Sequence, residues 1–170
     1  MGAEYDHTRH NVGFEVVDYL AEKFNVEFKN DILGDVATIK HKGRQFILLK
    51  PSTYMNRSGK AVRHWMTKTK VNIKNVLIVV DDLHLPFATL RLRTKGADGG
   101  HNGLKDIQQV LGTSNYQRLR IGIGRDFYPG EQVDYVLGKW SSEQKSALPD
   151  IIKQSAEAVL SFGSIGMAHT

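Results

Sequence analysis

The chain has 170 residues, of which 41% are hydrophobic and 24% charged, proportions typical of a globular protein in water. It contains no cysteine, which excludes disulfides, thiolate zinc sites and a cysteine nucleophile and fits a cytoplasmic protein. No apolar run is long enough for a membrane-spanning helix, and the formal net charge of +5 favours a polyanionic partner such as nucleic acid.

Hydrophobic spacing predicts a helix, a hairpin and a second helix in the first part of the chain. An apolar residue every fourth position from Val12 to Phe24 is typical of a helix with one buried stripe. The segments 34–40 and 44–50 flank a His-Lys-Gly turn, which indicates a β-hairpin. The segment 58–66 then predicts a helix with Ser58 as its N-cap.

The second half of the chain alternates strands with helices. The continuous apolar run 75–80 predicts a strand that is buried on both faces and stops before two aspartates. Two further strands are expected over 89–95 and 118–124, separated by a short helix that Gly112 closes. A long amphipathic helix, interrupted near Pro149, is expected over 141–162.

This order of elements predicts an α/β fold. We expect one domain over residues 1–170, with a mixed, mostly parallel sheet flanked by helices. Familiar nucleotide-binding and metalloprotease motifs are absent, so a nucleotide cofactor is not indicated.

Asp81 and Asp82 follow the buried strand, and ligands in open α/β sheets gather outside the carboxyl ends of strands. Asp81 is therefore a candidate to orient a histidine or to bind a metal. A strand-end turn or a helix cap is the alternative, and spacing alone favours it.

Two asparagines stand just before or at the start of predicted helices. Asn102 follows His101 in the glycine-rich stretch "KGADGGHNGLKDI", whose glycines let the backbone approach a ligand and whose helix start attracts anions. Asn56 precedes the helix that begins near Ser58 and could present its amide to a substrate. For both residues, simple capping or turn chemistry is the alternative.

Basic residues crowd the strand 89–95 and the elements after it. One strand face carries Arg91, Arg93 and Lys95, and four more cations follow in the chain, namely Lys105, Arg118, Arg120 and Arg125. Such a face could bind a phosphate backbone, or it could simply be solvated.

These stretches together resemble the bacterial peptidyl-tRNA hydrolase family. The segments "TRHNVGF", "KPSTYMNRSGKAV", "DDLHLP", "LRLRTKGADGGHNGLKDI" and "LRIGIGR" occur in the order and spacing of that family, and the resemblance runs from Gly2 to the end of the chain. It implies hydrolysis of the ester between a peptide and the 3′ end of tRNA, with peptidyl-tRNA as partner. It implies no metal, cofactor, membrane or obligate protein partner, and hence a monomer.

The resemblance also implies roles for individual residues. His10 matches the general base that takes a proton from water, and Asp81 matches the aspartate that orients it. Other positions match residues that hold the peptide or the tRNA end, namely Tyr5, Tyr54, Asn56 and Asn102. Phosphate contacts are implied for Arg93, Lys105 and Arg120.

The chain also departs from the family pattern. The family begins with a short hydrophobic strand and "GLGNPG", whose asparagine helps to select N-blocked substrates, and it runs a few residues past the position of His169. We expect both segments to be missing here and the selectivity to be weaker. Ala88 stands at a usual glycine and His84 at a usually acidic or small residue, and both changes should be tolerated.

Two other functions remain as alternatives. One is a catalytically weak RNA-binding relative of the same fold, which would not need His10, Asp81 and both asparagines together. The other is a metal-dependent hydrolase that uses His7, His10 and Asp81, which sensitivity to a chelator would reveal.

Overall fold

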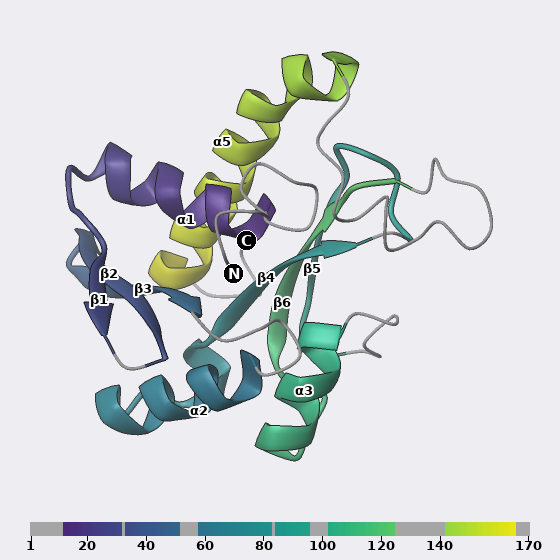
Figure 1. The fold of residues 1–170 in the computed structure, drawn as a ribbon. Coiled ribbons are helices and arrows are strands. Elements are labelled where there is room, and N and C mark those ends of the chain that lie inside the picture. Colours follow the sequence, from purple (N-terminus) through teal and green to yellow (C-terminus); the bar gives the residue numbers. More distant parts are fainter. Residues whose placement is uncertain are drawn as a thin grey trace.

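The computed structural model describes residues 12–31, 33–51, 58–82, 84–95, 102–124 and 142–165. Within these ranges, two three-stranded sheets lie side by side, and helices cover both faces of the assembly (Figure 1). The α/β fold expected from the sequence is confirmed.

The first sheet is an antiparallel meander. Its strands are β1 (Lys29–Asp31), β2 (Gly34–His41) and β3 (Arg44–Pro51), in that spatial order. The β2–β3 turn places Lys42 and Gly43 at φ values of 50° and 76°, the left-handed conformations that a two-residue hairpin turn needs. The predicted hairpin is thus confirmed, whereas the short exposed strand β1 was not expected.

The second sheet is mixed. It contains β4 (Leu77–Asp82), β6 (Gln117–Gly122) and β5 (Leu90–Arg93) in the order β4-β6-β5. The β4–β6 pair is parallel and the β5–β6 pair antiparallel. The expectation of a mostly parallel sheet is therefore wrong. A parallel pair needs a long crossover connection, but a long connection does not ensure parallel pairing: α3 lies in the chain between β5 and β6, which are antiparallel.

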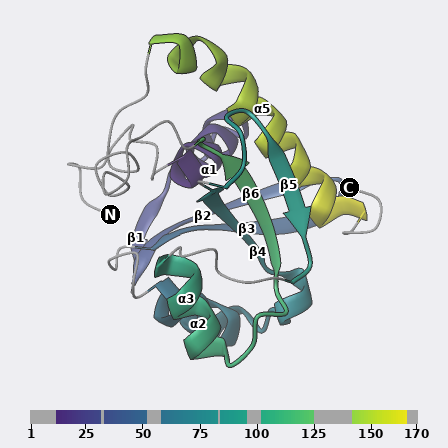
Figure 2. The same cartoon turned by 90° about the vertical axis from the view of Figure 1, so that its right-hand side faces the viewer.

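Two pairs of helices cover the sheets. The helices α1 (Val12–Lys23) and α5 (Ser142–Ile165) lie on one face, and α2 (Ser58–Thr69) and α3 (Asn102–Leu111) on the other (Figure 2). A 3-10 turn, η4 (Ile73–Asn75), leads into β4. Among the described helices, none combines the length and apolar character needed to cross a membrane.

Each face has its own hydrophobic core. The larger core joins α1 and α5 to β2, β3 and one face of β6, and it includes Val16, Leu20, Leu119 and Ile121. The smaller core lies on the other side of the second sheet, where α2 and α3 pack against β4. It includes Val80, Leu104, Ile107 and Tyr116. Since neighbouring strand residues point to opposite faces, β4 contributes to both cores.

Two details differ from the sequence prediction. The helix α5 runs continuously through Pro149, whose exposed position lets water solvate the backbone carbonyl that loses its helical partner. The strand β4 extends through Asp82, and its first three residues, 77–79, are only half-buried. Those residues line a cavity, and for them the expected burial on both faces is wrong.

Candidate functional site

The carboxyl end of β4 carries two buried carboxylates. Asp81 is 5% exposed and Asp82 is 7% exposed. Strand geometry directs them to opposite faces, with Asp81 on the side of Val79 and α1 and Asp82 on the side of Val80 and α2. The same strand end therefore presents one buried acid to each layer of helices.

Asp82 is committed to structural contacts. One carboxylate oxygen accepts a hydrogen bond from the backbone N–H of His84 at 2.8 Å, which fixes the turn after β4. The other oxygen pairs with Arg120 Nη1 at 3.1 Å. Because both partners are largely buried, solvent screens this ion pair less than it would screen an exposed pair.

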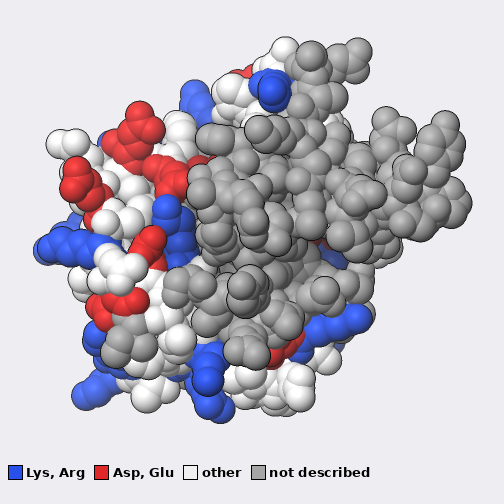
Figure 3. All heavy atoms as spheres, in the orientation of Figure 1, with Lys and Arg blue, Asp and Glu red and all other residues white. Residues whose placement is uncertain are grey.

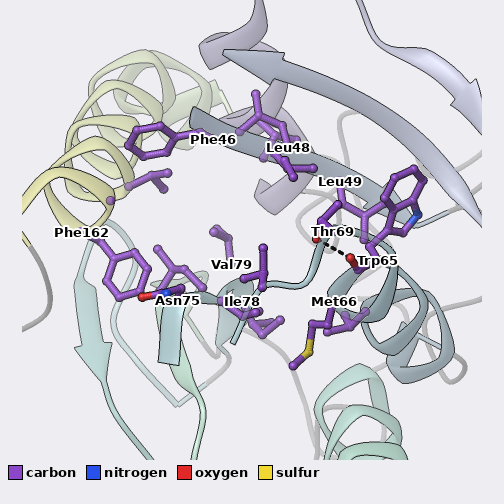
Figure 4. A pocket seen from close by; sticks show the side chains of 18 of the residues that line it. Phe46, Leu48, Leu49, Trp65, Met66, Thr69, Asn75, Ile78, Val79 and Phe162 are labelled. Carbon is purple, nitrogen blue, oxygen red and sulfur yellow. Dashed lines mark hydrogen bonds between the residues drawn. The ribbon is translucent and has the colours of Figure 1, made fainter. Parts of the chain in front are cut away.

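A cavity of about 770 Å³ lies between the two sheets. Its walls come from β3, β4, α2 and α5, and Figure 4 labels Phe46, Leu48, Val79, Trp65 and Phe162 among the side chains around it. Most of its surface is apolar. Within the described residues, β3 and β4 each have a strand partner on one side only, so the cavity separates two sheet edges.

The start of α1 reaches the same region. A Cβ atom on Gly13 would lie 2.7 Å from the carbonyl oxygen of Val79, so the helix contacts the strand through glycine. Gly13, Asp81 and Ser58 all line the cavity. The first turns of α1 and α2 and the end of β4 therefore converge.

The first turn of α2 is also joined to α3. The backbone N–H of Gly59 donates a hydrogen bond of 2.6 Å to the carboxylate of Asp106, which belongs to α3. The helix α2 begins at Ser58 and has no acidic residue in its first turn. The carboxylate that accepts a hydrogen bond from its N-terminus therefore comes from another element. Asn102, the first residue of α3, lies one turn before Asp106 on the same side of the helix.

Arginines meet in pairs across β5 and β6. The register places Arg91 opposite Arg120 and Arg93 opposite Arg118, so all four side chains leave one face of the sheet. Arg91 and Arg93 are exposed, as is Lys105 on α3. Figure 3 shows separate blue side chains along the lower edge of the molecule, with white and red ones between them. This face has the charge needed to attract a polyanion.

Arg118 is the buried member of this group, with no exposed surface. Its Nη2 donates to the carbonyls of Ser114 at 2.5 Å and Tyr116 at 3.4 Å, and its guanidinium lies 4.0 Å from the centre of the Tyr116 ring. Burial lowers the pKa of this guanidinium below its ordinary value. Within the part of the chain that the structure describes, its Nε and Nη1 atoms have no hydrogen-bond partner. Arg118 therefore makes its contacts inside the fold, whereas Arg93 is exposed to solvent.

The structure places some of the residues expected in the site and not others. Asp81, Arg93, Lys105 and Arg120 are described, and Asn102 is described as the helix start without its side chain. The remaining expected positions lie outside the described residues, namely Tyr5, His7, His10, Tyr54, Asn56 and His101. Among the side chains that are described, no three His, Asp or Glu residues gather closely enough to hold a metal ion.

Comparison with known proteins identifies the family. The family model described as peptidyl-tRNA hydrolase matches residues 1–170. The chain belongs to the peptidyl-tRNA hydrolase family. It is 51% identical to the peptidyl-tRNA hydrolase of Cytophaga hutchinsonii over 167 residues, which cover 98% of this chain and 89% of that protein. It is 52% identical to that of Phocaeicola vulgatus over 170 residues, which cover all of this chain and 91% of the relative.

Solved structures of peptidyl-tRNA hydrolases have the same fold. The crystal structure of the enzyme from Acinetobacter baumannii superposes with a TM-score of 0.88 at 36% identity, over 96% of this chain and 84% of that one. A complex of peptidyl-tRNA hydrolase with N-propanol gives the same TM-score at 37% identity, over 95% of this chain and 83% of that one. The sequence motifs and the backbone therefore point to the same family.

Sequence reasoning missed the contacts of three residues of this region, and Arg118, expected among the phosphate-binding cations, is buried. Asp106 is the carboxylate nearest the start of α2, Asp82 holds Arg120, and Arg118 lies buried beside Tyr116. The partners of these residues come from other elements, so spacing along the chain could not reveal the contacts. The absence of any acidic residue in the α2 segment was a usable signal that its N-terminus needs a carboxylate from elsewhere.

Proposed function

We propose that this chain hydrolyses the ester bond that joins a peptide to the 3′ end of tRNA, with His10 as general base and water as nucleophile. The observation that carries this function is the peptidyl-tRNA hydrolase match over residues 1–170. Identities of about 50% across nearly the whole chain support hydrolysis over the alternative of an RNA-binding relative without activity.

The position of Asp81 supports its role as the partner of His10. The carboxylate is buried on the face of β4 that carries α1, and α1 begins two residues after His10. Three extended residues span at most about 11 Å, so the chain keeps His10 within that distance of Gly13, which contacts β4. A carboxylate on the far nitrogen of an imidazole fixes its tautomer and stabilises the cation that forms as water loses a proton.

The basic face supports binding of the tRNA part of the substrate. Arg93 and Lys105 are exposed and can pair with phosphates without first breaking an ion pair shown in the structure. Arg120 differs, because its guanidinium already pairs with Asp82. We assign it a phosphate contact through its remaining N–H groups, with Asp82 holding the side chain in place.

The test uses the whole chain and N-acetyl-aminoacyl-tRNA. We expect release of the acetylated amino acid at the same rate with and without EDTA, and a loss of about 10² or more in rate for His10→Ala. His7→Ala is the matched control and should retain the wild-type rate. Asp81→Asn should lower kcat with little change in tRNA binding, because it removes the charge that supports a protonated imidazole.

Each contrary result identifies a different function. Tight tRNA binding without release of the amino acid would favour the RNA-binding alternative. Inhibition by EDTA together with loss of activity in His7→Ala would favour a metal-dependent hydrolase. We also propose a monomer without an obligate protein partner in the cytoplasm, which light scattering of the purified chain and fractionation of cells would check.

A further inference from the structure

The first turn of α2 lies close against the middle of α3. A Cβ atom on Gly59 would lie 2.6 Å from the carbonyl oxygen of Asp106 and 2.9 Å from the Cα atom of Ile107. No side chain fits at this contact, so glycine lets the two backbones touch. The start of α2 therefore rests on α3 one turn after α3 begins.

A single carboxylate bonds the two helices at this contact. The first N–H groups of any helix lack partners within it, and in α2 the Gly59 N–H donates to Asp106 Oδ2 at 2.6 Å. The first turn of α2 contains no acidic residue of its own. Asp106 thus supplies both the hydrogen-bond acceptor and the negative charge that the α2 N-terminus favours.

Both asparagines that the family resemblance assigns to the substrate are close to this contact along the chain. Asn102, the first residue of α3, precedes Asp106 by about one helical turn. Asn56 stands three residues before Gly59 in the chain. The contact therefore joins the two helices that begin at or just after these asparagines.

We propose that Asp106 is a positioning residue for peptidyl-tRNA hydrolysis, which ties the start of α2 to α3 so that Asn56 and Asn102 hold the peptide together. The inference rests on the proposed function. Asp106 itself touches neither the water nor the ester. Its effect is on how tightly the substrate is held, because two preorganised amides bind a peptide better than two independent ones.

The test compares Asp106→Ala with Asp106→Asn and with Leu111→Ala. Asparagine keeps an acceptor oxygen at the same place, whereas alanine removes it. Leu111 is half-buried at the opposite end of α3 and packs against the smaller core, so its truncation lowers stability without touching Gly59. Melting temperature, KM and kcat for N-acetyl-aminoacyl-tRNA are measured for all four proteins.

We expect Asp106→Ala to raise KM by about tenfold with a smaller change in kcat, because contacts made equally in ground state and transition state affect KM. Asp106→Asn should recover most of this loss, and Leu111→Ala should keep a wild-type KM despite its lower melting temperature. Amide hydrogen exchange at Gly59 should accelerate only in Asp106→Ala.

Two results would overturn the inference. One is an unchanged KM in Asp106→Ala. The other is a change in KM that follows the melting temperature equally in Asp106→Ala and Leu111→Ala, since the role would then be structural. If the wild-type chain releases no acetylated amino acid at all, the proposed function fails instead, and the Gly59 exchange rates still report on the contact itself.

Discussion

Gly122, the last residue of β6, should tolerate no side chain. A Cβ atom there would lie 2.1 Å from the carbonyl oxygen of Pro86, 2.9 Å from the Cβ atom of Leu85 and 3.0 Å from the Leu85 carbonyl oxygen. The two carbonyl oxygens belong to the backbone, and the Leu85 side chain is buried, so none of the three atoms can move aside by a side-chain rotation. In Gly122→Ala the turn after β4 must therefore move away from β6 by about 1 Å.

That movement strains the hydrogen bonds that dock the turn onto β6. The Gly122 N–H donates to Thr89 at 2.8 Å, the Gly124 N–H to Leu85 at 3.1 Å, and the Ala88 N–H to Gly122 at 3.3 Å. Each such bond contributes about 0.5–1.5 kcal/mol, so we expect a loss of about 2–4 kcal/mol. For a protein of this size the melting temperature should fall by about 5–15 °C.

Thermal unfolding of Gly122→Ala and Gly43→Ala tests this expectation. Gly43, unlike Gly122, has a positive φ, but open space surrounds its Cβ position, so alanine there adds only backbone strain of about 1 kcal/mol. Hydrolysis of N-acetyl-aminoacyl-tRNA, assayed well below both melting temperatures, should fall in Gly122→Ala alone, because the displaced turn begins beside Asp81. Equal melting temperatures for the two variants would refute the reasoning.

Three further predictions follow from the fold and the site. Ala88 has a φ of 69°, so Ala88→Gly should raise the melting temperature by about 2–4 °C because it relieves roughly 1 kcal/mol of backbone strain. An unchanged melting temperature would show that Ala88 is not strained. Arg93→Gln and Lys105→Gln should weaken tRNA binding and flatten its salt dependence by about one counterion each, while a small ester substrate is cleaved at the wild-type rate; equal losses on both substrates would place these residues in the active site or the fold. A hydrophobic strand and "GLGNPG" placed directly before Ala3, with the last Pro-Gly of the motif at positions 1 and 2, should fill the cavity between β3 and β4. This change should raise both the melting temperature and the preference for acetylated over free aminoacyl-tRNA, and unchanged values of both would disprove the expectation.

Much of the secondary structure was predictable because it depends on local patterns. The α1 stripe from Val12 to Leu20, the turn at Gly43 and the helix end at Gly112 all appear as expected, since side-chain spacing and left-handed glycine conformations act within a few residues. Pro149 misled the prediction because the cost of a helical proline depends on whether water reaches the freed carbonyl. Exposure of that kind is a property of the folded molecule.

The arrangement of the sheets was less predictable, because strand direction and pairing depend on the whole chain. Alternation identifies β5 as a strand but gives no sign that it runs antiparallel to β6. For the site, the carboxylate at the end of a buried strand could be anticipated, and Asp81 is indeed buried there. The contact of Asp106 with Gly59 joins residues 47 positions apart, and no local rule connects them.

The arginine pairs across β5 and β6 give salt two opposing effects on this protein. Like charges set directly opposite each other in a sheet repel, and among these four arginines only Arg120 has an ion pair shown within the described residues. Ions that screen this repulsion should stabilise the pairing of β5 with β6 in the protein without tRNA. The same ions should weaken the contacts between these arginines and the phosphates of tRNA. The buffer that best preserves the free protein is therefore the one in which it binds tRNA most weakly, and tRNA itself should act as a thermal stabiliser at low ionic strength.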